Sequence, residues 1–370
     1  MKICIVTPYF TPFIRGNEYG LAESLSKLGN QVTVITSKSK APREKPFGGE
    51  LIRNLPFNLI YLRTIVDFSE NPLVTNMLNN LIKKFDVVML QEDYPLICHS
   101  AFFAAKMHDV TTVLSSERTY IPADFKKRTG LAIFDLTVSR LLREEVNVFT
   151  VHCSASKRFL RDAIGVKRNI EVVHVGVNSY FRPIKDPIDY IDHKNEDLRI
   201  LSVARFHRYK GLNYLIMAMK KVVEEVDAEL YLLGKGEEEL HLKKLAERLN
   251  ISKHVNFVTK SIPNKEMPHV YSSCDVYVQP SIIEPFGIAV LEAMACQKPV
   301  IGTNVGGMLD TISHGKTGFR AKPTSSEEIA RYIIKLSDGK LRRKMGRNAR
   351  RKAEKFDWIE IGKKYIKLIT

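Results

Sequence analysis

Hydrophobic residues along the chain form short runs that alternate with stretches of helical spacing. Lys2–Val6 and Gln31–Ile35 are compact apolar runs, while residues 18–28 between them place apolar side chains every three or four positions, before Gly29. Short runs predict buried strands, and the wider spacing predicts an amphipathic helix that stops at glycine. The chain is therefore predicted to begin with a strand–helix–strand unit, which builds parallel sheets.

The same alternation continues through most of the sequence. In the first half it predicts strands at Asn58–Arg63, Phe85–Leu90, Thr111–Leu114 and Val146–Val151, with helices at Asn71–Lys84 and Pro95–His108. Near 174–196 it is interrupted by Gly, Asn, Pro and charged residues, which predict an interdomain connection. A second series then predicts strands at Arg199–Val203, Glu229–Leu233, Val255–Val258, Val276–Gln279 and Pro299–Thr303, and helices at Gly211–Glu225, Glu237–Leu249 and Gly287–Cys296.

Two consecutive series of this kind predict an α/β protein of two doubly wound, Rossmann-like domains. We expect residues 1–178 to form the first domain, 179–356 the second, and a final helix at about 357–370 to pack back on the first. Ligands of such sheets bind outside the carboxyl ends of the strands, so the prediction places a cleft where the two domains face each other.

Composition narrows the class of protein. The 370 residues have an average globular composition, and their apolar runs are shorter than a membrane span, so we expect a cytoplasmic protein. The five cysteines show no spacing typical of a zinc site or a disulfide framework.

The net charge of +16 favours a polyanionic partner, and the distribution of the charge along the chain indicates the kind of partner. Residues 340–370 contain 12 Lys/Arg against 3 Asp/Glu, while a stripe through Leu341, Met345, Ala349 and Ala353 is apolar. Two interpretations stay open: an amphipathic helix packed on the protein, or peripheral attraction to an anionic membrane, such as the inner membrane face. A basic nucleic-acid-binding protein is a remote alternative, because no recognition motif accompanies the charge.

Two segments after predicted strands contain residues suited to a phosphorylated sugar. In Pro280-Ser-Ile-Ile-Glu-Pro-Phe-Gly-Ile-Ala-Val-Leu-Glu292, Phe286 and Gly287 open a helix whose first N–H groups suit a phosphate, while Glu284 and Glu292 suit sugar hydroxyls. In Val203-Ala-Arg-Phe-His-Arg-Tyr-Lys-Gly211, Arg205 and Lys210 suit a diphosphate. Taken singly, each is equally compatible with an ordinary turn or a basic loop.

Together with Gly234-Lys-Gly236, Pro299–Gly307 and His314-Gly-Lys-Thr-Gly318, these segments resemble the nucleotide-sugar domain of retaining GT-B glycosyltransferases of family 4. The resemblance implies a hexosyltransferase that uses a UDP- or GDP-type sugar and a hydroxyl acceptor, with retention at the anomeric carbon and without a cofactor or metal. It assigns the diphosphate to Arg205 and Lys210, the donor sugar to Glu284, the ribose to Glu292, and backbone contacts to Gly16, Gly234, Phe286 and Gly287. A lipid-linked or cell-surface glycan precursor is the acceptor class that would suit a membrane-bound form.

The first half departs from this family's pattern at two places. The family usually has two adjacent glycines after the first strand, whereas Asn17 follows Gly16 here. The family also often has a histidine after a central strand, where this chain reads Ser115-Ser-Glu-Arg118, so Glu117 or Ser116 is a candidate replacement. His174 is interpreted as a structural histidine and His207 as an exposed loop residue. A sugar-nucleotide epimerase of the same two-lobed fold remains the alternative function.

Overall fold

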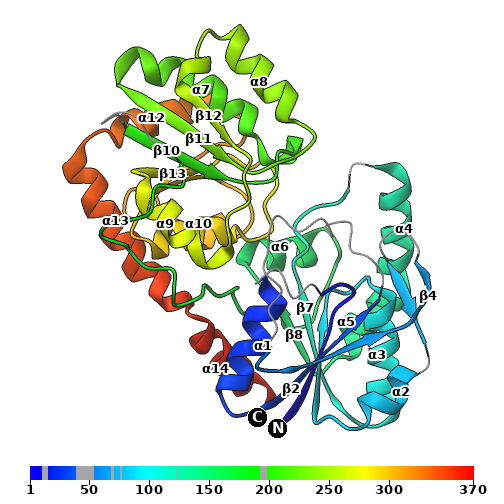
Figure 1. Ribbon diagram of the computed structural model, residues 1–370. Coiled ribbons are helices and arrows are strands. Elements are labelled where there is room, and N and C mark those ends of the chain that lie inside the picture. The colour runs from blue at the N-terminus through cyan, green and yellow to red at the C-terminus, as the bar shows by residue number, and fades with distance from the viewer. Residues whose placement is uncertain (11–15, 39–53, 68–70, 76, 123, 192–197) are drawn as a thin grey trace. The chain divides into compact units, whose positions relative to one another are not determined.

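The computed structural model describes residues 1–10, 16–38, 54–67, 71–75, 77–122, 124–191 and 198–370 (Figure 1). The chain divides into two compact units. Unit 1 comprises Met1–Gly176 and Trp358–Thr370, and unit 2 comprises Val177–Asp357. These boundaries lie two residues and one residue from the predicted ones. Residues 11–15 of the loop before Gly16, and 192–197 of the predicted connection, lie outside the described residues.

Within the residues that the structure describes, unit 1 is built on a parallel sheet of seven strands in the order β3-β2-β1-β6-β7-β8-β9. Apolar runs such as Ile3–Val6 are buried on both faces, as expected where helices cover a parallel sheet on either side. Its strands are β1 (Lys2–Val6), β2 (Gln31–Ser37), β3 (Asn58–Leu62), β6 (Val87–Gln91), β7 (Thr111–Ser116), β8 (Val148–Val151) and β9 (Glu171–Val172).

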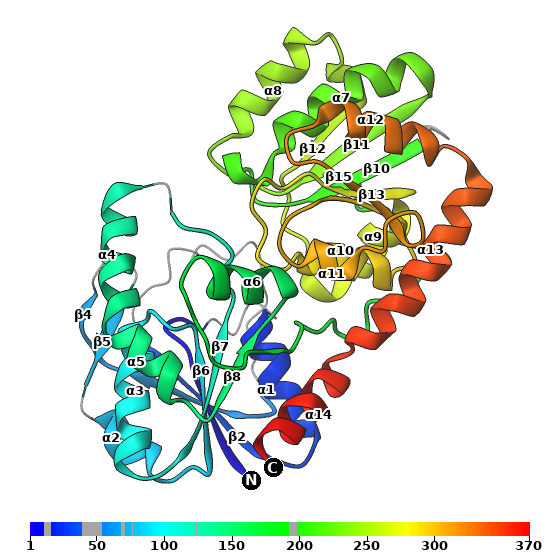
Figure 2. The same cartoon turned by 180° about the vertical axis from the view of Figure 1, so that it is seen from behind.

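Helices cover both faces of this sheet (Figures 1 and 2). On one face α1 (Asn17–Lys27) packs against the terminal helix α14 (Trp358–Ile369), whose Trp358 ring occupies the space that a Cβ on Gly20 or Gly176 would need. The close approach permitted by these two glycines explains how the end of the chain is held in unit 1. The other helices of the unit are α2 (Met77–Ile82), α3 (Leu96–Met107), α4 (Phe125–Leu136), α5 (Val138–Glu145) and α6 (Ser154–Asp162).

The predicted helix at Asn71–Lys84 is wrong in its first half. Strand β5 (Pro72–Val74) pairs antiparallel with β4 (Thr64–Asp67), and only Met77–Ile82 is helical. Proline lacks an N–H group and forces the preceding residue toward an extended conformation, so the segment suits an edge strand. Pairing with β4 then outweighs the helical spacing.

Unit 2 has a parallel sheet of six strands in the order β12-β11-β10-β13-β14-β15. The order reverses direction between β10 and β13, which is the switch point of a doubly wound sheet. Its strands are β10 (Leu198–Val203), β11 (Ala228–Leu233), β12 (Val255–Val258), β13 (Val276–Gln279), β14 (Val300–Thr303) and β15 (Gly318–Ala321).

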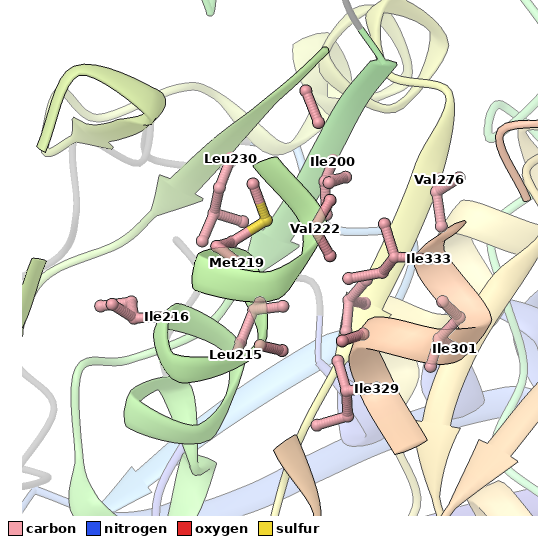
Figure 3. Close-up of a cluster of buried hydrophobic side chains, with 14 of the residues drawn as sticks. Ile200, Leu215, Ile216, Met219, Val222, Leu230, Val276, Ile301, Ile329 and Ile333 are labelled. Carbon is pink, nitrogen blue, oxygen red and sulfur yellow. The ribbon is translucent and has the colours of Figure 1, made fainter. Parts of the chain in front are cut away.

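The core of unit 2 lies between this sheet and α7 (Leu212–Glu225), α8 (Glu239–Arg248) and α12 (Ser326–Lys335). Figure 3 shows Leu215, Met219 and Val222 of α7 and Ile333 of α12 packed over the strand residue Ile200. These side chains recur at helical spacing on α7, so the apolar stripe read from the sequence faces the sheet. The remaining helices are α9 (Met267–Ser273), α10 (Ile288–Ala295), α11 (Met308–Thr311) and α13 (Gly339–Ala353).

The basic segment near the C-terminus forms α13, and its apolar stripe is buried, with Met345, Ala349 and Ala353 in the interior. Two of its cations serve the fold. Arg350 donates to the Phe181 and Ala295 carbonyls, and Lys352 donates to the Asp310 carbonyl. Of the two interpretations of the basic C-terminal segment, α13 therefore agrees with an amphipathic helix packed on the protein. Among the described residues, no helix combines the length and apolar character needed to cross a bilayer.

Candidate functional site

Four loops of unit 2 meet at the carboxyl edge of its sheet. They follow β11, β10, β13 and β14, which are neighbours in that order. All four strands are parallel, so their carboxyl ends lie on the same edge. The candidate residues Arg205, Lys210, Gly234, Glu284 and Gly287 belong to these loops.

Glycines let the four loops stack in direct backbone contact. A Cβ on Gly234 would overlap the Ala204 carbonyl, one on Gly211 would overlap the Pro280 carbonyl, and one on Gly306 would overlap the Glu284 carbonyl. Each pair joins two neighbouring loops, and all three glycines have positive φ, which side chains disfavour. The main chain itself therefore sets the spacing of the loops that carry the candidate side chains.

Lys210 and Glu284 meet directly at this edge. The Lys210 Nζ lies 2.7 Å from Glu284 Oε2, and both side chains are largely buried. The same carboxylate oxygen accepts hydrogen bonds from the Ser281 hydroxyl at 3.0 Å and from Gln279 Nε2 at 3.3 Å. A carboxylate with this many donors is held in one orientation. Lys210 is the last residue of the 3₁₀ turn Arg208–Lys210, and Gly211 caps this turn.

Arg205 lies on the same loop as Lys210 but in a different setting. Its side chain is exposed, and its guanidinium donates to the Tyr209 hydroxyl at 2.6 Å. An exposed guanidinium retains donors that can form a forked contact with phosphate oxygens.

Helix α10 begins at Ile288, immediately after Gly287, whose φ is +91°. Phe286 is buried below this start, and a Cβ on Gly307 would overlap its ring. The first N–H groups of a helix have no partner within it, and they favour an anion. The start of α10, next to Glu284, therefore has the backbone geometry that anions favour.

Glu292 lies on α10, five residues after Gly287, and has a different partner from Glu284. It accepts a hydrogen bond from the Tyr271 hydroxyl at 2.7 Å. Burial raises the pKa of the Glu292 carboxyl to about 7, although the Tyr271 hydroxyl lowers it. The Tyr271 ring packs 5.7 Å from Tyr277, whose hydroxyl donates to Gln279. The two predicted carboxylates are therefore linked through aromatic residues.

Unit 1 places a second polar cluster at the carboxyl edge of its own sheet. Asn17, at the start of α1, brings its Nδ2 to 3.1 Å from His152 Nε2 and to 3.5 Å from Glu117 Oε1. His152 follows β8, and its Nδ1 lies 3.2 Å from the Val173 carbonyl. A carbonyl accepts only, so Nδ1 carries the proton and Nε2 accepts from Asn17. Burial lowers the pKa of His152, which favours this neutral form.

Glu92 follows β6 and fixes the backbone at Glu117. Its carboxylate accepts from the Glu117 N–H at 2.6 Å and from the Ser116 hydroxyl at 3.1 Å. Its own φ is +77°, which is rare for a residue with a Cβ. Burial, with the nearby charges of Glu117 and Asp93, raises the pKa of Glu92 well above its ordinary value.

The structure differs from the sequence prediction at some of these positions. Gly16 caps α1 with an extended conformation at φ −77°, so its backbone needs no glycine. His174 lies just past β9 and is partly buried. Sequence reasoning missed Glu92, His152, Gln279 and Ser281. The available signal was position, because each follows or ends a predicted strand at the edge where parallel sheets bind ligands.

Comparison with known families matches both halves of the chain. Residues 188–352 match the model "Glycosyl transferases group 1", and residues 19–180 match the model "Glycosyltransferase Family 4". An uncharacterized glycosyltransferase of Methanocaldococcus jannaschii is 28% identical, over 99% of this chain and 97% of its own length. The N-acetyl-alpha-D-glucosaminyl L-malate synthase of Bacillus anthracis is 35% identical, over 41% of this chain and 39% of its own.

Solved structures share the fold over the whole chain. Anabaena HepE in complex with UDP aligns with a TM-score of 0.81, over 99% of both chains at 18% identity. A sucrose-phosphate synthase from Thermosynechococcus elongatus aligns with a TM-score of 0.78, over 99% of this chain and 98% of its own at 21% identity. Both comparisons match two parallel-sheet units to the two units described above, which is the GT-B architecture.

Proposed function

Because the chain belongs to the group 1 and family 4 glycosyltransferases, we propose that it transfers a hexose from a UDP- or GDP-type sugar to a hydroxyl acceptor, with retention at the anomeric carbon. The observation that carries the proposal is the Lys210–Glu284 pair at the carboxyl edge of unit 2. It places a cation and an oriented carboxylate beside a helix N-terminus, a combination suited to a sugar attached to a diphosphate. HepE, which shares the fold, was solved with UDP.

In this proposal unit 2 is the donor-binding domain. Lys210 and Arg205 hold the diphosphate and offset the negative charge that develops on it as the sugar leaves. The backbone N–H groups after Phe286 and Gly287 add to this stabilisation, and Gly234 lets the neighbouring loop approach the donor. The charge is offset by side chains and backbone alone, so the reaction needs no metal ion or other cofactor.

The two glutamates then have separate roles. Glu284 is oriented by Ser281 and Gln279, which suits a group that accepts hydrogen bonds from the donor sugar. Glu292 lies farther along α10 and is proposed to bind the ribose. The leaving phosphate helps to deprotonate the acceptor, so no enzymatic nucleophile is assigned.

Unit 1 is proposed to supply the acceptor-side groups, with Glu117 as the side chain that contacts the acceptor. Asn17 and His152 orient it, and Glu92 holds its backbone. A lipid-linked or cell-surface glycan precursor is the acceptor class we favour, reached by peripheral attachment to an anionic membrane. The sulfoquinovosyl transferase of Arabidopsis thaliana, 26% identical over 90% of this chain, is a relative whose name indicates sugar transfer.

The test measures binding and product together. Thermal unfolding is followed with UDP-, GDP- and ADP-sugars, because a ligand that binds the native state raises its stability by RT ln(1 + [L]/Kd). The sugar that stabilises the wild-type protein should stabilise Lys210→Ala far less. Products are then analysed with and without a hydroxyl acceptor. Transfer that requires the acceptor supports the proposal, whereas an altered donor sugar without acceptor indicates an epimerase and contradicts it.

A further inference from the structure

Four charged side chains of unit 1 meet next to Glu117, and all four are largely buried. Arg118 directly follows Glu117 and forms a bidentate contact with Asp135 of α4, in which Nη2 lies 3.0 Å from Oδ2. Arg143 of α5 pairs with the same aspartate, and its Nε lies 2.7 Å from Asp93 Oδ2. The side chains of Arg118, Asp93 and Arg143 are 8%, 0% and 3% exposed. Together with Asp135 they form the charge quartet of unit 1.

The segment that carries Glu117 is restrained from two neighbouring positions after β6. The Glu92 carboxylate accepts from the Glu117 N–H at 2.6 Å, and the next residue, Asp93, lies 3.9 Å from the Arg118 guanidinium. Strands β6 and β7 are paired neighbours, so both restraints act at the same carboxyl edge of the sheet. Two consecutive residues after β6 therefore restrain two consecutive residues after β7.

Stability alone does not account for the charge quartet. Removing these charges from water costs free energy that their mutual attraction only partly offsets, so apolar side chains of similar volume would stabilise the unit at least as well. The quartet does fix geometry, because each aspartate contacts both arginines and no member can rotate without losing a buried partner. Asp93 is held further through its backbone carbonyl, which accepts from His99 Nε2 of α3 at 2.8 Å and from the Ser139 hydroxyl of α5.

We propose, on the basis of the function proposed above, that Arg118 is a positioning residue for the acceptor side of the reaction and acts through Glu117. The charge quartet holds Arg118 so that Glu117 Oε1 stays 3.5 Å from Asn17 Nδ2 and 3.7 Å from His152 Nε2. Because Asp135 belongs to α4, the quartet also makes the place of the Glu117 carboxylate depend on where α4 lies. The groups assigned to the diphosphate and the donor sugar belong to unit 2 and are not part of this network.

A charge-neutral double variant separates positioning from stability. Arg118→Met leaves Asp135 with one buried partner and should lower the thermal unfolding midpoint by several degrees. Arg118→Met/Asp135→Asn removes one charge of each sign and keeps the Asp93–Arg143 pair, so much of that stability should return. Transfer by the double variant should stay about ten-fold below wild type with an unchanged donor dissociation constant, because the restraint on Glu117 is still missing. Recovery of full transfer along with stability would overturn the proposal.

Glu117→Gln shows whether Arg118 acts through Glu117. Adding Glu117→Gln to the double variant should lower transfer no further than Glu117→Gln alone, because both changes remove the same group from its place. A loss of about one hundred-fold, the product of two independent effects, would show that the charge quartet acts elsewhere and would overturn the proposal. Arg140→Met/Glu144→Gln is the matched control, since it removes an exposed ion pair of α5 and should change neither transfer nor donor binding.

Nuclear magnetic resonance tests the positioning independently of transfer. The imidazole nitrogen signals of His152 respond to a carboxylate near Nε2, so they should move in the same direction in Glu117→Gln and in the Arg118/Asp135 double variant. They should keep their wild-type values in the Arg140/Glu144 control. Signals that move in Glu117→Gln but not in the double variant would overturn the proposal. Normal transfer by Glu117→Gln would instead contradict the proposed acceptor role of Glu117, and the His152 signals would still decide whether Arg118 positions it.

Discussion

The two units have the same architecture, but they differ in the contacts at the carboxyl edges of their sheets. In unit 2, Gly211, Gly234 and Gly306 bring neighbouring loops into backbone contact, and the exposed large hydrophobic residues described there number three. In unit 1, the described cluster is made of side chains from Asn17, Glu117 and His152. Fourteen of the large hydrophobic residues that the structure describes in this unit are exposed.

This difference has a physical consequence. A backbone-built edge tolerates few substitutions, because each glycine is constrained by both its φ and its neighbour. A side-chain-built edge can change residue by residue without altering the fold. Unit 2 is accordingly the half in which the sequence resembles the glycosyltransferase motifs closely, and unit 1 is the half that departs from them at Asn17 and Glu117.

The largest effect is expected from adding a side chain to the backbone-built edge. Gly306→Ala combines a left-handed backbone with overlap of the Glu284 carbonyl and should lower the free energy of unfolding by about 3 kcal/mol or more. Gly315→Ala is the matched control, since Gly315 also has positive φ but has nothing within 4 Å of its would-be Cβ. It should cost about 1–2 kcal/mol. Equal losses in urea unfolding would show that the close approach is unimportant.

Glu284→Gln should lower turnover about 100-fold while the donor dissociation constant changes little. An oriented carboxylate at the sugar acts mainly in the transition state, so its loss is expected in rate rather than in affinity. Single-turnover rates and calorimetry measure the two quantities. Glu239→Gln breaks an ion pair of the same 2.7 Å length on the surface and should retain full activity. Near-normal turnover in Glu284→Gln would remove this residue from the mechanism.

Arg205→Ala and Lys210→Ala should each raise the donor dissociation constant about ten- to hundred-fold, because a charge-assisted contact contributes roughly 1.5–3 kcal/mol. Lys210→Ala should also leave the largely buried Glu284 carboxylate without its cation, and so have the larger effect. Arg208→Ala, an exposed cation in the same turn, is the control. Titration by calorimetry that finds unchanged affinity in both variants would contradict the diphosphate assignment.

In unit 1, Glu117→Gln should lower transfer about ten-fold without weakening donor binding. This is less than the loss of about 100-fold or more expected for a proton-transfer group, because Glu117 is proposed only to contact the acceptor. The comparison predicts this separation, because the side chains assigned to the donor all belong to unit 2. Glu145→Gln, which breaks an exposed pair with Lys106, should change neither quantity. Weaker donor binding in Glu117→Gln would show that donor binding and acceptor contact are not separated between unit 2 and unit 1.

The smallest effect concerns pH and Glu292. Its pKa is raised by burial to about 7 in the folded protein, above the ordinary value near 4.5 in the unfolded chain. The native state therefore binds more protons, so this contribution to stability is complete below pH 4.5 and is lost as the pH rises toward 7. Thermal unfolding should show this decline, by at most about 1 kcal/mol per pH unit, and Glu292→Gln should reduce it. Glu292→Gln should also weaken donor binding. An identical pH profile in the variant would contradict the raised pKa.

Local patterns in the sequence were enough to predict the α/β class, the two series of strands and helices, and the motifs of unit 2. These features depend on local patterns: apolar runs predict buried strands, and Gly211, Gly234 and Gly287 stand next to the predicted strand and helix ends where glycine is needed. The apolar stripe of α13 was also readable in advance, since residues four apart on a helix share a face.

Which side chains meet depends on the tertiary structure. Lys210 and Glu284 are 74 residues apart, and Asn17 meets His152 across 135 residues, so no local pattern joins them. It also decided that Pro72–Val74 is a strand, because its partner β4 supplies the hydrogen bonds. The exposure of Phe125, Ile133 and Leu136 on α4 is likewise a tertiary property. Helical spacing can identify an apolar face, but the face is buried or exposed according to what the rest of the fold places against it.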